Sequence, residues 1–168
     1  MNSKSAKSIK PHQSIKIGIC GFGTVGGGSY NLLHNNAEEI TRRVGCAIDV
    51  IRIASRRLKS SDVASTVKVS NDPFDVVNDP DVDIVIETLG GFDPAFEVVR
   101  QALANGKHVV TANKALIAER GSELFAVAEE NAVTLAFESS VAGGIPIIKA
   151  LREGLSANKI DWLAGIIN

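Results

Sequence analysis

Three glycines at fixed spacing lie where a strand is expected to give way to a helix. They occur in the run Gly21-Phe22-Gly23-Thr24-Val25-Gly26, which follows the alternating apolar segment Ile15 to Cys20. Apolar residues then recur at helical spacing from Val25 to Ile40. In such a corner the first glycine permits the tight turn, the second lets the backbone approach a pyrophosphate, and the third lets helix and strand pack closely. The run therefore predicts dinucleotide binding through residues 21–26, and the alternative is a merely tight strand-to-helix turn.

The corner after the second expected strand carries two positive charges and no acidic residue. It reads Ser55-Arg56-Arg57 after the apolar run Ile48 to Ser55. Sites selective for NAD usually place Asp or Glu here, where it accepts a hydrogen bond from the ribose 2′-hydroxyl. A guanidinium instead matches a phosphate in charge and geometry. Arg56 and Arg57 thus favour NADP, with NAD still possible, over a reading as two solvated surface arginines.

Further polar residues follow two other expected strands. Lys114 comes after the strand His108 to Thr111, and Thr88 and Gly90 come after the strand Asp83 to Glu87. Ligands of open α/β sheets bind at this carboxyl edge. A lysine there can hold a substrate oxyanion or relay a proton, although on its residue type alone Lys114 reads as an exposed lysine early in a helix. Thr88 and Gly90 are expected to line the nicotinamide side of the cleft, and the alternative is an ordinary turn.

Other residues with chemical potential give weaker signals. Glu138 opens a glycine-rich turn ending at Pro146, and a carboxylate with backbone carbonyls suits a hard cation, although the residues alone favour a structural turn. Lys107 is expected to be solvated. The three histidines show no metal-ligand spacing, and Cys20 and Cys46 are expected to be buried free thiols in a reducing cytoplasm.

Strands and helices alternate along most of the chain. The expected strands are Ile15 to Cys20, Ile48 to Ser55, Asp83 to Glu87, His108 to Thr111 and Val133 to Phe137. Three expected helices follow the glycines, Pro73 and Pro94, and another runs from Ser122 to Asn131. A helix from Ile145 to Leu155 and a strand from Lys159 to Ile167 are expected at the end of the chain. Repeated β–α–β spacing predicts an α/β fold, a Rossmann-type doubly wound parallel sheet covered on both faces.

The composition excludes several functional classes. The chain has 168 residues, of which 45% are hydrophobic and 22% charged, with a formal net charge of −1. This balance gives no reason to expect a nucleic-acid or membrane partner. No apolar run approaches the roughly 18 residues that suggest a membrane span. Residues 1–14 read as a disordered tail.

Four spaced motifs together resemble homoserine dehydrogenases. The matching stretches are Ile19 to Gly28, Glu87-Thr88-Leu89-Gly90-Gly91, Gly106 to Ala115 and Phe137 to Pro146, and Gly165-Ile166-Ile167-Asn168 resembles the start of the next motif. The resemblance implies NADP-dependent interconversion of L-homoserine and L-aspartate 4-semialdehyde, on the route to threonine, methionine and isoleucine. It also implies a small-molecule substrate, a cytoplasmic location and, in the full-length protein, a homodimer.

The resemblance assigns roles to particular residues as well. Lys114 corresponds to the active-site lysine near the nicotinamide. A monovalent cation, usually sodium, would be bound by Glu138 and the backbone carbonyls of Val141, Gly143 and Ile145. The alternatives are another Rossmann oxidoreductase and a module that binds NADP without turnover.

The domain division expected from these motifs leaves the second domain incomplete. Residues 15–144 would form the nucleotide-binding domain, and residues 145–168 would begin an α+β substrate and dimerisation domain. Because the chain ends inside an apolar strand pattern, a longer polypeptide is expected. The resemblance places the family's substrate carboxylates and a second lysine in that following domain, so this chain alone is expected to be inactive.

Overall fold

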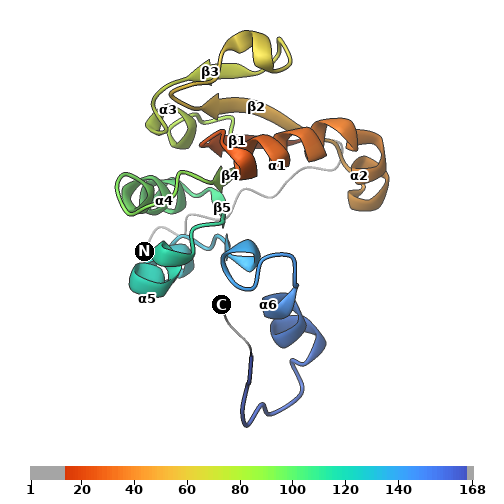
Figure 1. The fold of residues 1–168 in the computed structure, drawn as a ribbon, viewed down its shortest axis with the longest axis vertical. Coiled ribbons are helices and arrows are strands. Elements are labelled where there is room, and N and C mark those ends of the chain that lie inside the picture. Colours follow the sequence, from red (N-terminus) through yellow and green to blue (C-terminus); the bar gives the residue numbers. More distant parts are fainter. Residues whose placement is uncertain (1–13, 166–168) are drawn as a thin grey trace.

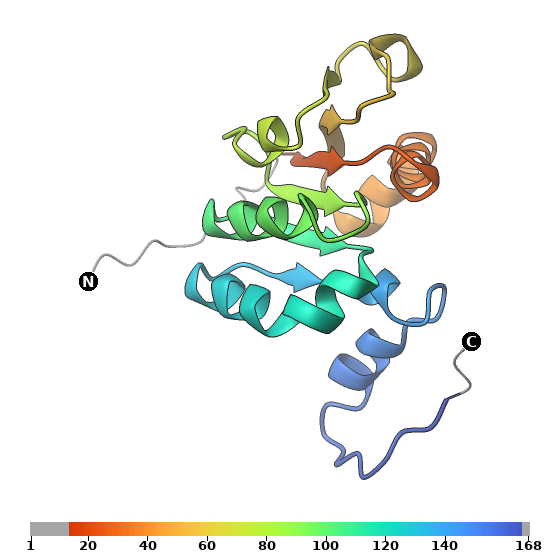
Figure 2. The ribbon, with the colours of Figure 1, turned by 60° about the vertical axis from the view of Figure 1, so that its left-hand side comes forward.

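A six-stranded parallel sheet organises the structure, a computed structural model that describes residues 14–165. The strand order is β3-β2-β1-β4-β5-β6, so the order reverses between β1 and β4 (Figures 1 and 2). The strands are β1 (Ile15–Cys20), β2 (Ile48–Ala54), β3 (Lys68–Ser70), β4 (Ile84–Glu87), β5 (His108–Thr111) and β6 (Leu135–Ala136). The α-helices are α1 (Thr24–Asn35), α2 (Ala37–Val44), α3 (Phe74–Val77), α4 (Ala95–Ala104), α5 (Lys114–Glu130) and α6 (Ile147–Lys149). The predicted α/β, doubly wound fold is confirmed.

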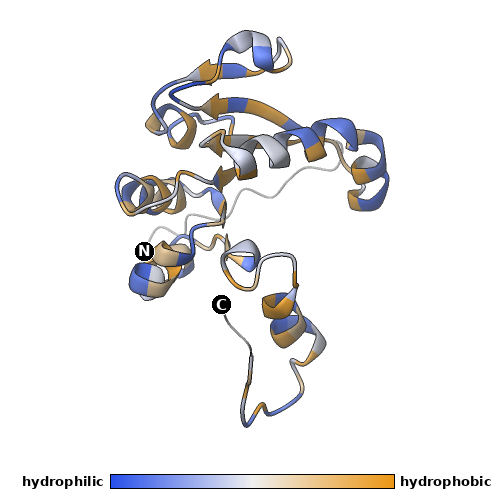
Figure 3. Ribbon diagram, viewed as in Figure 1, coloured by the Kyte–Doolittle hydropathy of each residue, from blue (hydrophilic) through white to orange (hydrophobic). Residues whose placement is uncertain are grey.

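The two faces of the sheet are covered unequally. One face packs against α3, α4 and α5, where buried side chains such as Val99 and Leu124 belong to the larger apolar cluster. The other face packs against α1, where Tyr30 joins Ile19 and Ile53 in a smaller cluster. Figure 3 shows the hydrophobic central strands between helices that also carry hydrophilic residues. On the α1 side, Val110 of β5 remains 37% exposed.

Several element boundaries differ from the sequence expectation. The expected helical run from Val25 to Ile40 breaks at Asn36 into α1 and α2, and the Asn36 side chain donates to the carbonyl oxygen of Leu32. Helix α5 begins at Lys114 instead of Ser122, because the side chain of Asn113 caps its first turn. The short edge strand β3 was not predicted.

The expected strand from Lys159 to Ile167 is wrong over its described part. Residues 159–165 form no strand, and Trp162 and Leu163 are 79% and 69% exposed. A strand forms only when a neighbour pairs with its backbone groups, and no described segment lies beside this one as a partner. The helix expected from Ile145 is present as α6 followed by the π-helix Ala150–Gly154. Residues 1–13 of the predicted tail and residues 166–168 lie outside the described residues.

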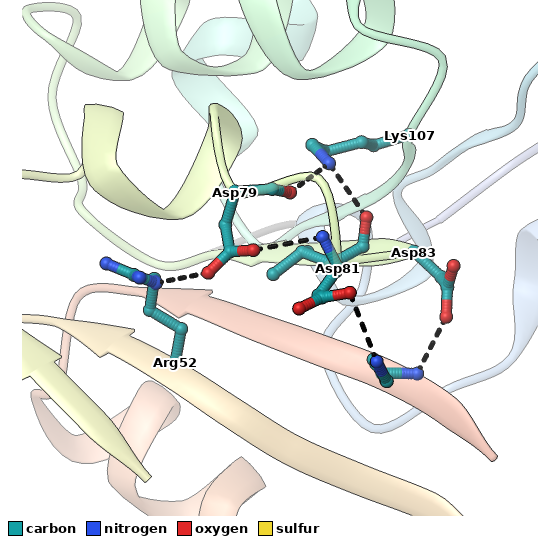
Figure 4. A network of polar contacts seen from close by, with 7 residues as sticks. Arg52, Asp79, Asp81, Asp83 and Lys107 are labelled. Atoms are coloured by element: carbon teal, nitrogen blue, oxygen red, sulfur yellow. Dashed lines mark hydrogen bonds and ion pairs between the residues drawn. The ribbon is translucent and has the colours of Figure 1, made fainter.

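Lys107 corrects a second expectation, because it is buried and not solvated. The residue is 5% exposed, and its Nζ donates to the carbonyl oxygens of Asp79 (2.6 Å) and Val82 (2.8 Å). The Asp79 carboxylate in turn accepts from Arg52 (2.7 Å) and from the backbone N–H of Asp81 (2.9 Å), as Figure 4 shows. This network lies at the amino edge of the sheet, where it ties the segment before β4 to β2 and β5.

The charge state of Asp79 follows from these contacts. Burial opposes ionisation of its carboxyl group, but the hydrogen bonds from Asp81 and Arg52 and the positive charges of Arg52 and Lys68 outweigh it. The pKa of Asp79 therefore lies below its ordinary value. The pair with Arg52 stays ionised at neutral pH and is lost only as the pH falls through that lowered pKa.

The buried ammonium of Lys107 gives a stability prediction. Lys107→Met keeps most of the apolar stem but leaves the Asp79 and Val82 carbonyls without their donor, so the free energy of unfolding should fall by about 2–4 kcal/mol. Denaturant titration of the two proteins measures the difference. Lys159→Met is the matched control, because that side chain is 89% exposed and its loss should change stability by less than about 0.5 kcal/mol. Equal stabilities of the two variants would contradict a structural role for Lys107.

Candidate dinucleotide site

The glycine turn joins the end of β1 to the start of α1. Gly21 has a φ of +97°, and a Cβ there would lie 2.7 Å from the carbonyl oxygen of Thr88. A Cβ on Gly26 would lie 2.2 Å from the Gly21 carbonyl oxygen. The first and third glycines are therefore required by the fold itself. Gly23 differs, because a Cβ there meets no atom within 4 Å, so its lack of a side chain leaves open space above the turn.

Thr88 supports this turn from the neighbouring strand. Its backbone N–H donates to the Cys20 carbonyl (2.8 Å), and its hydroxyl is within hydrogen-bonding distance of the carbonyl oxygens of Cys20 (3.2 Å) and Gly21 (3.1 Å). The hydroxyl has only one proton, so these contacts occupy it. Thr88 thus braces the glycine turn, while its place on the nicotinamide side of a cleft, with Gly90, stays a prediction.

The arginine corner lies directly beside the glycine turn. The N–H of Gly21 donates to the carbonyl oxygen of Ala54 (2.9 Å), and Ser55 follows at the end of β2. Arg56 and Arg57 are exposed, and neither forms an ion pair within residues 14–165. Two solvated guanidinium groups are thus held next to the turn, and no carboxylate of the described residues neutralises them.

Lys114 is the first residue of α5 and is exposed at the same carboxyl edge. All strands of the sheet are parallel, so the ends of β1, β4 and β5 lie on one side, where Figure 2 shows their arrows pointing the same way. The Asn113 side chain fixes the start of α5 by accepting the N–H of Leu116 (3.2 Å). The sheet therefore brings the glycine turn, the loop with Thr88 and the lysine to one edge.

One buried acidic residue was not identified as a site residue from the sequence. Glu87 ends β4, is fully buried, and accepts from the Thr111 hydroxyl (2.5 Å) and the Leu89 N–H (2.8 Å). The sequence feature that could have identified Glu87 is a carboxylate at the end of an otherwise apolar strand. Burial, with the negative charges of Glu87 and Asp72, raises the pKa of the neighbouring Cys20 thiol far above its usual range.

The two cysteines differ in their surroundings. Cys20 is buried and free, as predicted, and its raised pKa keeps it as a neutral thiol. Cys46 is free but only half-buried, so the expectation that both thiols are buried is wrong for Cys46.

Glu138 caps a helix in this structure. Its Oε1 accepts the N–H of Ile148 (2.9 Å) and its Oε2 accepts the N–H of Lys149 (2.9 Å). The carbonyl of Ile145 accepts the N–H of Ile147 (2.8 Å), whereas those of Val141 and Gly143 accept no hydrogen bond within the described chain. Across residues 14–165 no group of three His, Cys, Asp or Glu side chains could hold a metal. Glu138 therefore has a capping role in this structure, and cation binding by Glu138 and the carbonyls of Val141, Gly143 and Ile145 stays a prediction.

The fold and the edge geometry define the class of this protein. A parallel sheet whose order reverses beside a glycine turn at a helix N-terminus is a Rossmann-type dinucleotide-binding domain. The profile described as "Homoserine dehydrogenase, NAD binding domain" matches residues 21–138, more than half of the chain. The chain belongs to the homoserine dehydrogenase family through this NAD-binding domain.

Individual relatives agree with that assignment. The chain is 58% identical over 154 residues to the homoserine dehydrogenase of Pseudomonas aeruginosa. This alignment covers 92% of this chain and 36% of that enzyme. The crystal structure of a homoserine dehydrogenase from Thiobacillus denitrificans superposes with a TM-score of 0.82 at 56% identity, covering 89% of this chain and 35% of that one. A hyperthermophilic archaeal homoserine dehydrogenase in complex with NADPH superposes with a TM-score of 0.70 at 32% identity, covering 86% and 50%.

The chain spans only about a third of the length of the curated relatives that it matches. Within residues 14–165, no helix has the length and apolar character that crossing a bilayer would require.

Proposed function

We propose that this chain forms the cofactor-binding part of a homoserine dehydrogenase that interconverts L-homoserine and L-aspartate 4-semialdehyde with NADP, as a step of threonine and methionine biosynthesis. The observation that carries the proposal is the arrangement at one sheet edge of a glycine turn open above Gly23, the exposed corner with Arg56 and Arg57, and Lys114. The match to the NAD-binding domain of homoserine dehydrogenase supports this choice of substrate class.

The residues of this chain fit a dinucleotide. The open space above Gly23 and the N-terminus of α1 would receive the pyrophosphate, because the backbone N–H groups there carry partial positive charge. A bound nicotinamide would supply the hydride acceptor for the alcohol carbon, or the hydride donor for the aldehyde carbon. Lys114 would hold the reacting oxygen, stabilising its negative charge or moving the proton at that atom.

Activity of the full-length protein that carries this sequence tests the function. Homoserine and NADP should together give a rise in the absorbance of reduced nicotinamide, and neither should do so alone. An assay without turnover on homoserine, but with turnover on another alcohol, would replace this proposal with a different Rossmann oxidoreductase.

Three finer assignments extend the proposal. We place the domain boundary near residue 144, with residues 145–168 beginning a substrate and dimerisation domain of a cytoplasmic homodimer. A monovalent cation, such as sodium, would bind the carbonyls of Val141, Gly143 and Ile145 beside Glu138. The carbonyls of Val141 and Gly143 accept no hydrogen bond from residues 14–165, which supports this assignment. Replacing sodium by choline in the assay tests it.

Cofactor preference gives a direct prediction. NADP should bind about ten- to a hundredfold more tightly than NAD, since a charge-assisted contact to the 2′-phosphate contributes on the order of 1.5–3 kcal/mol. Arg56→Ala or Arg57→Ala should remove most of this difference, measured by calorimetric titration with both nucleotides. Arg42→Ala is the control, because Arg42 pairs with Glu39 on α2. Equal affinities of the unmutated protein for NADP and NAD would contradict the assignment.

A further inference from the structure

A buried carboxylate connects the two loops that follow β4 and β5. Glu87 and Thr111 are paired in the register of these parallel strands. Glu87 is fully buried, and no ion pair joins it to a cation within the described residues. Both of its oxygens instead accept hydrogen bonds, from the Thr111 hydroxyl and from the N–H of Leu89. Burying a carboxyl group in this way is costly unless its hydrogen bonds are kept, so these two contacts are strongly favoured.

The first contact orders the turn that leads to the lysine. The Thr111 hydroxyl donates its single proton to Glu87 Oε2. The lone pairs of the same hydroxyl oxygen then accept the N–H of Asn113 (3.0 Å). The Ser140 hydroxyl donates to the Thr111 carbonyl (2.8 Å) and holds the turn from its other side. Asn113 caps α5, so this chain of contacts ends at Lys114.

The second contact orders the loop after β4. Leu89 is held by Glu87, and two residues later the Gly91 carbonyl accepts from the Asn113 side-chain amide (2.6 Å). A closed ring of contacts therefore runs from Glu87 through the loop to Gly91, across to Asn113 and back through Thr111. The side-chain nitrogen of Asn113 closes this ring, and the side-chain oxygen of the same residue caps α5.

The same loop also reaches the glycine turn. Thr88, between Glu87 and Leu89, contacts the carbonyl oxygens of Cys20 and Gly21 through its hydroxyl. The loop after β4 is thus bonded on one side to the turn that would hold the pyrophosphate, and on the other side to the start of α5. Each of these links is a side-chain or backbone hydrogen bond between residues far apart in the sequence.

We propose that Glu87 and Asn113 are positioning residues, which fix Lys114 relative to the glycine turn through the loop of residues 88–91. This inference rests on the proposed function, in which Lys114 acts beside a cofactor held by that turn. Positioning of reacting groups supplies several kcal/mol of barrier reduction, and displacements of about 1 Å can lower a rate 10²-fold. Neither residue is proposed to touch the substrate.

The decisive variant is Asn113→Ser. Serine is also a favourable N-cap residue, so α5 keeps its start, but its short side chain does not reach the Gly91 carbonyl. In the full-length protein we expect kcat for homoserine oxidation to fall 10- to 100-fold, while the NADPH dissociation constant changes less than threefold. Asn131→Ser is the matched control, because Asn131 makes a similar amide-to-carbonyl bond (2.9 Å to Val127) at the other end of the same helix.

Amide hydrogen exchange measures the connection between the loops after β4 and β5 and does not require catalytic turnover. Asn113→Ser and Glu87→Gln should each raise exchange in residues 88–92 at least tenfold, and Asn131→Ser should not. A protein that is inactive on homoserine would contradict the proposed function, and the exchange comparison would still decide the link between the loops. Unchanged exchange in Asn113→Ser would overturn the inference. Unchanged kcat would also overturn it. A fall in kcat that is accompanied by comparable weakening of NADPH binding and by a lower melting temperature would overturn it as well, because these joint losses indicate a purely structural role.

Discussion

Gly23→Ala should weaken NADPH binding by roughly 100-fold or more while leaving the fold intact. The backbone at Gly23 has a φ of −85°, which alanine adopts without strain, and its Cβ would meet no protein atom within 4 Å. The added methyl group would instead occupy the space through which the pyrophosphate approaches the backbone. Calorimetric titration measures the affinity, and thermal unfolding should show a melting temperature close to that of the unmutated protein.

Two other glycines of the same segment provide controls. Gly28→Ala should keep full affinity, because a Cβ there also meets nothing within 4 Å and lies inside α1, where alanine is favoured over glycine by about 1 kcal/mol. Gly26→Ala should lose both affinity and stability, since its Cβ would overlap the Gly21 carbonyl oxygen. Normal NADPH binding by Gly23→Ala would rule out the glycine turn as the pyrophosphate site.

Lys114→Ala should lower kcat/KM for homoserine in the full-length protein by about 10²-fold or more, the usual range for removing an acid–base or oxyanion-stabilising group. The side chain is exposed and forms no ion pair within the described residues, so the melting temperature should barely change. Steady-state kinetics and thermal unfolding of the same preparation separate these two effects. Lys159→Ala, which removes an equal charge from an exposed position, should leave the kinetics unchanged.

Lys114→Arg distinguishes between the two possible roles of the lysine. Arginine keeps the positive charge but does not release its proton at accessible pH. Partial recovery of kcat by Lys114→Arg would indicate that the residue stabilises charge on the oxygen, and no recovery would indicate proton transfer. Activity of Lys114→Ala near that of the unmutated protein would show that the lysine takes no part in the reaction.

The amino-acid sequence alone determined the elements whose signals are local. The alternating apolar run Ile15–Cys20 is a strand with the expected bounds, because side chains of a strand alternate between two faces. The strand His108–Thr111 is likewise as expected. Spacing also located the glycine turn, since its first and third glycines are required by backbone geometry within a few residues. The α/β class followed from the alternation of such elements.

Only the tertiary structure decided the features that depend on distant partners. Lys107 looked like a solvated lysine, yet carbonyl groups 25 and 28 residues earlier in the chain accept its protons inside the protein. Glu87 looked like the end of a strand, and Thr111, 24 residues later, makes it part of the link to Lys114. The apolar segment after Lys159 has strand-like residues, but no strand lies beside it among residues 14–165. Local patterns indicate on which face of a helix or strand a residue lies. Burial of a charge and pairing of a strand depend instead on which distant residues the fold places against that face.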